Sequence, residues 1–257
     1  MTGPATIDEI CVVAVAEAFR GDGEILCNPI GTVPIIGGRL ARATFEPDMA
    51  MTDAVSVLAA NILPVGDPDA PRVVEAWMPY RDMFDIVWSG RRHVVMGASQ
   101  IDATGNQNLA AIGGWRMPKA QLLGLRGAPG NLVNHVTTYW VPNHSTRSFV
   151  PRVDVVSGPG YERVADLSEA VRNNHEIRRV VSNLGVFDFE TPDHRMRLRS
   201  VHPGVSVMVW AGNSYCPGIC TTRWNWKLVP AEIPEKVDEE FPAPSSVMKN
   251  PPPGGLG

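Results

Sequence analysis

The chain has 257 residues, 44% of them hydrophobic, and a net charge of −4 at pH 7. This is enough for one large domain or two small ones with a well-buried core. The acidic balance argues against a nucleic-acid partner, and four cysteines are too few for a disulfide scaffold. No uninterrupted apolar stretch reaches the length of about 18 residues that a membrane span needs. The first residues, MTGPATIDEI, lack the basic region and apolar core of a signal peptide. We therefore expect a cytoplasmic protein with reduced thiols and no membrane contact.

The N-terminal residues predict a helix, a strand and a second helix. Thr6 and Glu9 form a capping-box pattern, and apolar residues keep helical spacing from there to about Phe19. Glu24 to Cys27 predicts the first core strand. The turn that follows leads into a helix ending near Thr44.

Strand and helix patterns then alternate at short intervals. Ala50 to Asp53 predicts a short strand, Val73 to Met78 is an apolar run, and Met83 to Trp88 predicts an amphipathic helix. This alternation is typical of an α/β fold with an open, mainly parallel sheet flanked by helices.

The central stretch, from Arg91 to Asn143, combines apolar runs with polar loops. His93 to Ala98 predicts a buried strand, and the polar turn DATGNQN follows it. A second apolar run, Gln121 to Leu125, leads into a glycine-rich segment. Ligands bind beyond the ends of strands in open α/β sheets, so we expect the site here. The stretch is rich in side chains that form hydrogen bonds without net charge: Asn106, Gln107, Asn108, Asn131, Asn134 and His135.

The remainder of the αβ pattern consists of strands and one ambiguous segment. Leu167 to Asn174 is either helical or looped. The predicted strands are Val136 to Val141, Val153 to Val156, Arg179 to Phe189 and Met196 to Val201.

The C-terminal residues differ in composition from the preceding chain. They carry several prolines and end in PPPGGLG, which predicts little packed structure. We therefore divide the chain into a domain over residues 1–207 and an atypical, proline-rich tail over residues 208–257.

Several dispersed strings resemble a known family. GRRHVVMGASQID, GNQN, LRGAPGN, VDVVSGPGY and VVSNLGVFDF are similar, in this order, to the beta subunit of the class I CoA-transferase superfamily. Within it they resemble the branch that opens a steroid ring, whose beta subunits are of the IpdB type. The resemblance covers roughly residues 5 to 205 and does not extend into the tail.

The resemblance implies a CoA-transferase-like fold and a heteromeric hydrolase. The implied partner is an alpha subunit that carries the catalytic glutamate, in an assembly of two alpha and two beta chains. The implied substrate is a steroid-derived CoA thioester from cholesterol catabolism, opened by hydrolytic C–C cleavage. No further cofactor is implied, because the substrate itself carries coenzyme A.

The position of the transferase nucleophile separates two functions. Class I CoA-transferases use a glutamate as nucleophile, but the matching region, residues 49–63, contains no glutamate and only one carboxylate, Asp53. Asp53 is either a nucleophile or a turn residue whose side chain caps backbone amides. The missing glutamate favours the hydrolase. An ordinary CoA-transferase subunit and a non-catalytic scaffold remain alternatives.

The candidate site residues come from the central stretch. His135 and Asn131 are the candidates for a supporting catalytic role, with structural roles as the alternatives. Arg126 is suited to a phosphate or carboxylate of the substrate, or to a surface ion pair. The backbone amides of a glycine turn can face an anion or carbonyl. The expected substrate-binding residues are therefore Arg126, Gly127, Gly130, Asn134, Asn106 and Gln107.

Two other groups of residues have competing interpretations. The remaining histidines are dispersed and Cys216 and Cys220 lack a second pair, so we predict no metal site. An aromatic and methionine cluster is interpreted as helical core, with a wall for a bulky acyl group or an intersubunit contact as the alternative. Its members are Trp77, Met78, Tyr80, Met83, Phe84 and Trp88.

Overall fold

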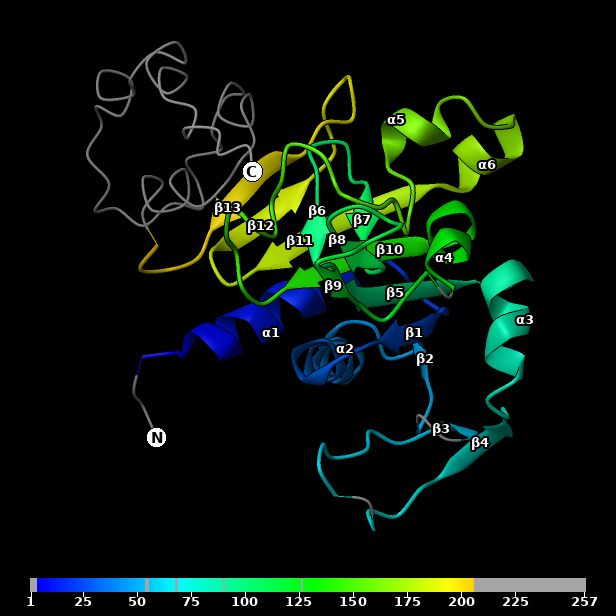
Figure 1. Ribbon diagram of the computed structural model, residues 1–257. Helices are drawn as coiled ribbons and strands as arrows, with labels where there is room; N and C mark the ends of the chain where they lie inside the picture. The colour runs from blue at the N-terminus through cyan, green and yellow to red at the C-terminus, as the bar shows by residue number, and fades with distance from the viewer. Residues whose placement is uncertain (1–3, 54–55, 68, 90, 126, 206–257) are drawn as a thin grey trace, which may run out of the picture.

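A computed structural model describes residues 4–53, 56–67, 69–89, 91–125 and 127–205. Its centre is a seven-stranded sheet with the order β13-β12-β11-β10-β5-β1-β2 (Figure 1). The strands are β1 (Leu26–Pro29), β2 (Ala50–Met51), β5 (Arg92–Gly97), β10 (Val136–Val141), β11 (Glu176–Ser182), β12 (Gly185–Asp188) and β13 (Arg197–Val201). The first five pair in parallel and the last two join antiparallel. The predicted open, mainly parallel sheet is confirmed.

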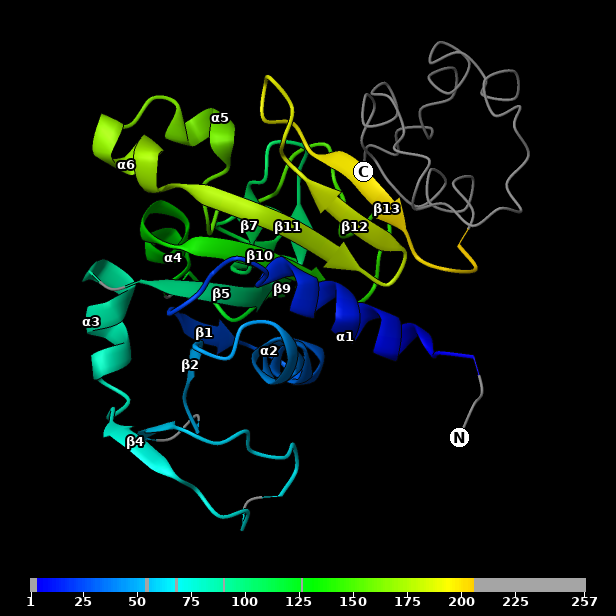
Figure 2. The same cartoon turned by 180° about the vertical axis from the view of Figure 1, so that it is seen from behind.

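Helices cover both faces of this sheet (Figures 1 and 2). They are α1 (Ile7–Ala18), α2 (Thr32–Thr44), α3 (Asp82–Ser89), α4 (Ala128–Asn134), α5 (Tyr161–Val164) and α6 (Glu169–Asn174). Alternate residues of β5 point to opposite faces. Val95 therefore packs in one core cluster with Phe19, the C-cap of α1, while Val94 packs in another with Leu132 of α4.

Most predicted elements agree with the structure, and three differ. The capping box of α1 is present, with both Thr6 and Glu9 making their reciprocal bonds. Residues 153–156 form no strand, because Asp154 is held in a loop by its bonds with Gln100. The span from Arg179 to Phe189 holds the turn between β11 and β12. The expected glycine turn at residues 127–131 is instead the start of α4.

Short two-stranded hairpins lie outside the central sheet. They are formed by β3 (Val57–Ala59) with β4 (Val74–Trp77), β6 (Gln100–Ile101) with β7 (Gln107–Asn108), and β8 (Ala111–Ile112) with β9 (Ala120–Gln121). The β3–β4 hairpin projects away from the sheet, and α3 follows directly after it (Figures 1 and 2).

The aromatic side chains of β4, of α3 and of the loop between them do not form a core within this chain. Trp77, Tyr80, Phe84 and Trp88 are between 52% and 72% exposed, and we call these four residues the aromatic face. The interpretation of these four as helical core is wrong, because α3 lies at the margin of the fold where no other described element covers them.

The strand order identifies where a ligand is expected. From β1 the chain crosses to β2 on one side and then returns to β5 on the other side of β1. Such a reversal opens a crevice outside the carboxyl ends of the strands, which is the usual ligand site of open α/β sheets. The carboxyl end of β1 is followed by Gly31, whose φ of 108° suits a glycine and lets the chain turn directly into α2.

Candidate active site

A cavity of about 590 Å³ lies where the strand order reverses. Its wall includes the carboxyl ends of β1 and β2, the N-terminus of α2, and the facing sides of α3 and α4. Much of that wall is apolar, with Met51, Met83 and Phe84 among the lining residues. A cavity of this size, apolar with a few polar groups, is typical of a small-molecule site.

Arg92 is the most unusual side chain of the cavity. It begins β5, is only 4% exposed, and lines the cavity. Its guanidinium donates to the Asn28 Oδ1 at 2.7 Å and to the Asn131 Oδ1, and it contacts the Met83 sulfur. All these partners are neutral, and the Nε atom has no partner in the described part of the chain. Burial lowers the pKa of Arg92 to about 10, so it remains charged at neutral pH.

A second arginine and a helix end add positive charge to the same cavity. Arg39 of α2 lines it, and one of its terminal nitrogens is buried without a partner among the described residues. Gly31, the N-cap of α2, also lines the cavity. That helix end has no side-chain cap and no acidic residue in its first turn. Helix N-termini carry a partial positive charge, so the cavity combines three sources of positive potential.

Asp53 is the one carboxylate among the described residues that line the cavity. Its Oδ1 accepts hydrogen bonds from the backbone amides of Ser56 at 2.9 Å and Val57 at 3.1 Å. Its Oδ2 lies 3.4 Å from the Nε of Arg72. This is the turn-capping role that the sequence left open beside the nucleophile.

The predicted residues of α4 divide into those at the cavity and those behind it. Gly127 and Asn131 line the cavity. Gly130 faces α3 instead, where an added Cβ would lie 2.8 Å from the Val87 side chain. Asn134 does not line the cavity, and Arg126 lies outside the described residues.

His135 is buried behind α3 and not on the cavity wall. Its Nε2 donates to the Val87 carbonyl at 2.7 Å, while its Nδ1 is buried without a partner in the described structure. Burial is the main cause that lowers its pKa, so the ring is held neutral. Its position would let it orient α3 against α4.

Asn106 and Gln107 lie on a separate polar turn beyond β5. The Asn106 amide donates to Asp102 at 3.0 Å and Glu162 at 3.0 Å, and its carbonyl accepts from the Gly160 amide at 2.8 Å. Gln107 donates to the Gly97 carbonyl at 3.0 Å, and its own side-chain oxygen has no partner among the described residues. Neither of these two residues lines the larger cavity with Asn131.

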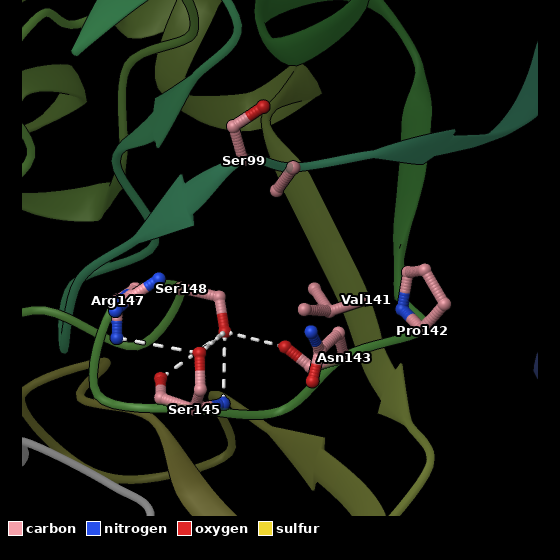
Figure 3. Close-up of a pocket in the computed structure, with 8 residues that line it drawn as sticks. Ser99, Val141, Pro142, Asn143, Ser145, Arg147 and Ser148 are labelled. Atoms are coloured by element: carbon pink, nitrogen blue, oxygen red, sulfur yellow. Dashed lines mark hydrogen bonds between the residues drawn. The ribbon is translucent and has the colours of Figure 1, made fainter.

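A second, smaller cavity of about 260 Å³ lies at the carboxyl ends of β5 and β10 (Figure 3). The hydroxyl groups of Ser145 and Ser148 already form hydrogen bonds within the loop that carries them. Ser148 donates to the Asn143 carbonyl at 2.8 Å, and Ser145 accepts from the Arg147 amide at 3.3 Å. We therefore place the candidate site in the larger cavity.

The residues that sequence reasoning missed are Arg92, Arg39 and Asn28. One signal was available, because Arg92 precedes a run of buried apolar residues in which a charge is costly. Among the described residues, no group of three or more potential ligands is arranged to hold a metal ion. Within the same ranges, none of the helices has the length and apolar character needed to cross a bilayer.

Comparisons with known proteins identify related chains. No family model matches the sequence. The chain is 52% identical over 206 residues to the cholesterol ring-cleaving hydrolase IpdB subunit of Rhodococcus jostii, covering 80% of each chain. The structure is similar to the crystal structure of Rhodococcus jostii RHA1 IpdAB, with a TM-score of 0.78, 50% identity, and 82% and 84% of the two chains covered. A more distant relative is a 3-oxoadipate CoA-transferase subunit of Pseudomonas knackmussii, at 26% identity over 77% of this chain and 78% of the relative.

Proposed function

This chain belongs to the family of IpdB-type subunits within the class I CoA-transferase superfamily, and from that premise we propose that it is the beta subunit of a hydrolase that opens a ring of a steroid-derived CoA thioester. The observation that carries the proposal is the close similarity to the Rhodococcus subunit along most of both chains. The reaction belongs to cholesterol and steroid catabolism, and the only coenzyme in it is the CoA on the substrate.

The reaction is a hydrolytic C–C cleavage in the retro-Claisen sense. A carboxylate base takes a proton from water, and the oxygen adds to a ring ketone carbon. The C–C bond breaks, and its electron pair moves onto the carbon next to the second carbonyl, where it is held as an enolate. That carbon then takes a proton, and the former ketone carbon becomes a carboxylate on the same, ring-opened product. The step needs a correctly placed base and fixed positive or donor groups for the developing negative charge.

The chain supplies positive groups to this reaction, and we assign the base to the partner. Arg92, Arg39 and the N-terminus of α2 give the cavity its positive potential. The carboxylate of Asp53 is engaged by two backbone amides and Arg72. An alpha subunit that brings a glutamate to this cavity would complete the site, in an assembly of two alpha and two beta chains.

The aromatic face is the surface that we assign to the alpha subunit. Exposed apolar patches of this kind mark interaction sites, and aromatic residues are enriched at interfaces. Tyr80 and Phe84 also line the cavity, so a partner that covers the aromatic face would close the cavity as well. Trp88→Glu should therefore prevent assembly. Leu167→Glu, an exposed apolar residue before α6, is the control that should still assemble. Light scattering after size exclusion gives both the result and the stoichiometry.

The test of the function is an assay of the co-expressed chains. The assembled complex should convert a steroid-derived CoA thioester to its ring-opened product with uptake of one water. An ordinary CoA-transferase would instead exchange a labelled carboxylic acid into the thioester. Exchange without ring opening would overturn the proposal, and an active preparation of this chain alone would overturn the assignment of the base to the partner.

A further inference from the structure

We propose that Arg92 and Arg39 form a binding site for a carboxylate on the acyl portion of the ligand. The inference rests on the proposed function for the identity of the ligand, but it is argued from the cavity itself. It goes beyond the assignment of a base to the partner, because it names the group that this chain recognises.

The first argument is the charge that Arg92 leaves unbalanced. Burying a guanidinium almost completely costs free energy unless an anion compensates its charge. The partners of Arg92 are two asparagine oxygens and a thioether, and no carboxylate contacts it among the described residues. The asparagines orient the side chain, but they do not neutralise it.

The second argument is that other uncompensated positive groups line the same cavity as Arg92. Arg39 reaches the same cavity with a buried nitrogen that has no partner in the part of the chain the structure describes. The uncapped N-terminus of α2 faces it as well. Asp53 does not offset these groups, because its carboxylate pairs with Arg72 and two backbone amides.

The third argument concerns which anion fits. A guanidinium presents parallel N–H groups that match a carboxylate or a phosphate. The cavity wall around Arg92 is apolar, with Met83, Phe84 and Val87 among its members. Such a wall suits a hydrocarbon group that ends in a single carboxylate, whereas a strongly hydrated phosphate would lose its water there without replacement. We therefore assign the carboxylate to the acyl portion and leave the CoA phosphates outside the cavity.

The carboxylate can have two sources, because ring opening itself creates one from the ketone carbon. A carboxylate already on the substrate would contact Arg92 before the reaction, and the new one only after it. Both sources predict the same recognition by the same two arginines. They predict different kinetics, which the experiment below distinguishes.

The binding test uses glutarate as the probe, the neutral glutaramide as its uncharged counterpart, and inorganic phosphate as the competing class. Calorimetric titration of the co-expressed complex and of the full chain alone should show millimolar binding of glutarate and at least tenfold weaker binding of the other two. Arg92→Gln should weaken glutarate binding tenfold or more. Arg163→Gln, which removes an exposed positive charge on α5, should leave it unchanged.

Several results would overturn the inference. Equal binding of phosphate and glutarate would assign the arginines to a phosphate group. Binding to the chain alone but not to the complex would mean that the partner subunit supplies the anion. An equal loss of glutarate affinity in Arg92→Gln and Arg163→Gln would mean that the net charge of the protein, and not a specific site, attracts glutarate. If Arg92→Gln does not fold, Arg39→Gln is tested in its place, because Arg39 is only partly buried.

Kinetics on the complex separate the two sources. A substrate carboxylate predicts that Arg92→Gln raises KM at least tenfold with kcat within about threefold of wild type. A product carboxylate predicts an unchanged KM with product inhibition at least tenfold weaker. A KM and a product inhibition constant that are both unchanged in Arg92→Gln would overturn the inference. A complex that binds glutarate through Arg92 but opens no ring would refute the proposed function and leave the carboxylate site standing.

Discussion

The turn around Asn106 and the cavity around Arg92 both bury polar side chains, yet they differ in how these side chains are paired. Asn106 donates to Asp102 of the same turn and to Glu162 of α5, and its side-chain oxygen accepts from the Gly160 amide. Arg92 is buried to a similar degree, but its charge meets only neutral partners. We therefore use charge balance, and not polarity alone, to propose a structural role for Asn106 and a ligand-binding role for Arg92.

The largest expected effect is a loss of stability when a paired polar side chain is removed from the turn around Asn106. Asn106→Ala should lower the free energy of unfolding by roughly 2–4 kcal/mol, because it leaves several buried partners unmatched at about 1–3 kcal/mol each, partly relieved by relaxation. Urea denaturation measures it. Asn174→Ala, at an exposed helix end, is the control. Glutarate binding by the folded variant should be unchanged. A stability loss below about 0.5 kcal/mol, the scale of ordinary surface substitutions, would contradict the view that this turn is structural.

Lowering the pH should destabilise the core through its buried histidines, and it should leave the positive charge of the cavity unchanged. His144 stacks on Phe149 with the ring centroids 3.7 Å apart, and burial lowers its pKa to about 4. The unfolded chain therefore binds a proton more readily between pH 6.5 and 4. The stabilising contribution is present above pH 6.5 and is lost as the pH falls toward 4.

We expect His144 to account for roughly 1–3 kcal/mol of this loss. Burial also lowers the pKa of four other histidines, which add to the loss with the same sign: His93, His135, His175 and His202. His144→Gln should reduce the slope of unfolding free energy against pH between 6.5 and 5 without removing it. An unchanged slope would contradict the assignment. Arg92 stays charged throughout this range, so the cavity keeps its positive potential.

Local sequence signals account for much of the fold. The capping box of α1 and the apolar run of β5 depend on neighbours in the chain, and both were predicted. The helix α4 was predicted as a turn, because its glycine and proline suggest one. Contacts that come only from the fold stabilise it as a helix: Gly130 packs on Val87, and Leu132 lies in the core.

The site was predicted in part, and the missing part is non-local. Asn131 and Gly127 were named and do line the cavity. Arg92 was not, because its significance depends on what surrounds it. Its partners Asn28 and Asn131 are 64 and 39 residues away in the sequence. The sequence shows that an arginine precedes a buried strand, but only the fold shows that no carboxylate meets it among the described residues.

A moderate gain in stability is expected when the charge of Arg92 is removed from the cavity. Arg92→Met should raise the free energy of unfolding of the unliganded protein by about 1 kcal/mol, because it removes an uncompensated buried charge. The gain is limited because Asn28 and Asn131 lose their donor. Thermal and urea unfolding measure it, and Arg163→Met is the matched exposed control. A loss of stability greater than about 1 kcal/mol would contradict this interpretation and class Arg92 with Asn106, as a side chain held for the fold.

The smallest expected change in stability is at Asp53, a cavity residue whose side chain is paired. This side chain lines the cavity like Arg92, but it is satisfied like Asn106. Asp53→Asn keeps the oxygen that caps Ser56 and Val57, and it loses the ion pair with the half-exposed Arg72. Such a pair contributes about 0–1 kcal/mol, so stability should change by no more than this.

Asp53→Ala should cost more stability but still leave substantial ring-opening activity, because the base is assigned to the partner. Steady-state kinetics of both folded variants test this. A fall in kcat of several orders of magnitude in either would move the catalytic carboxylate to this chain. Asp53 would then be the reacting group of the cavity, and the two backbone amides whose hydrogen bonds it accepts would be the means of placing it.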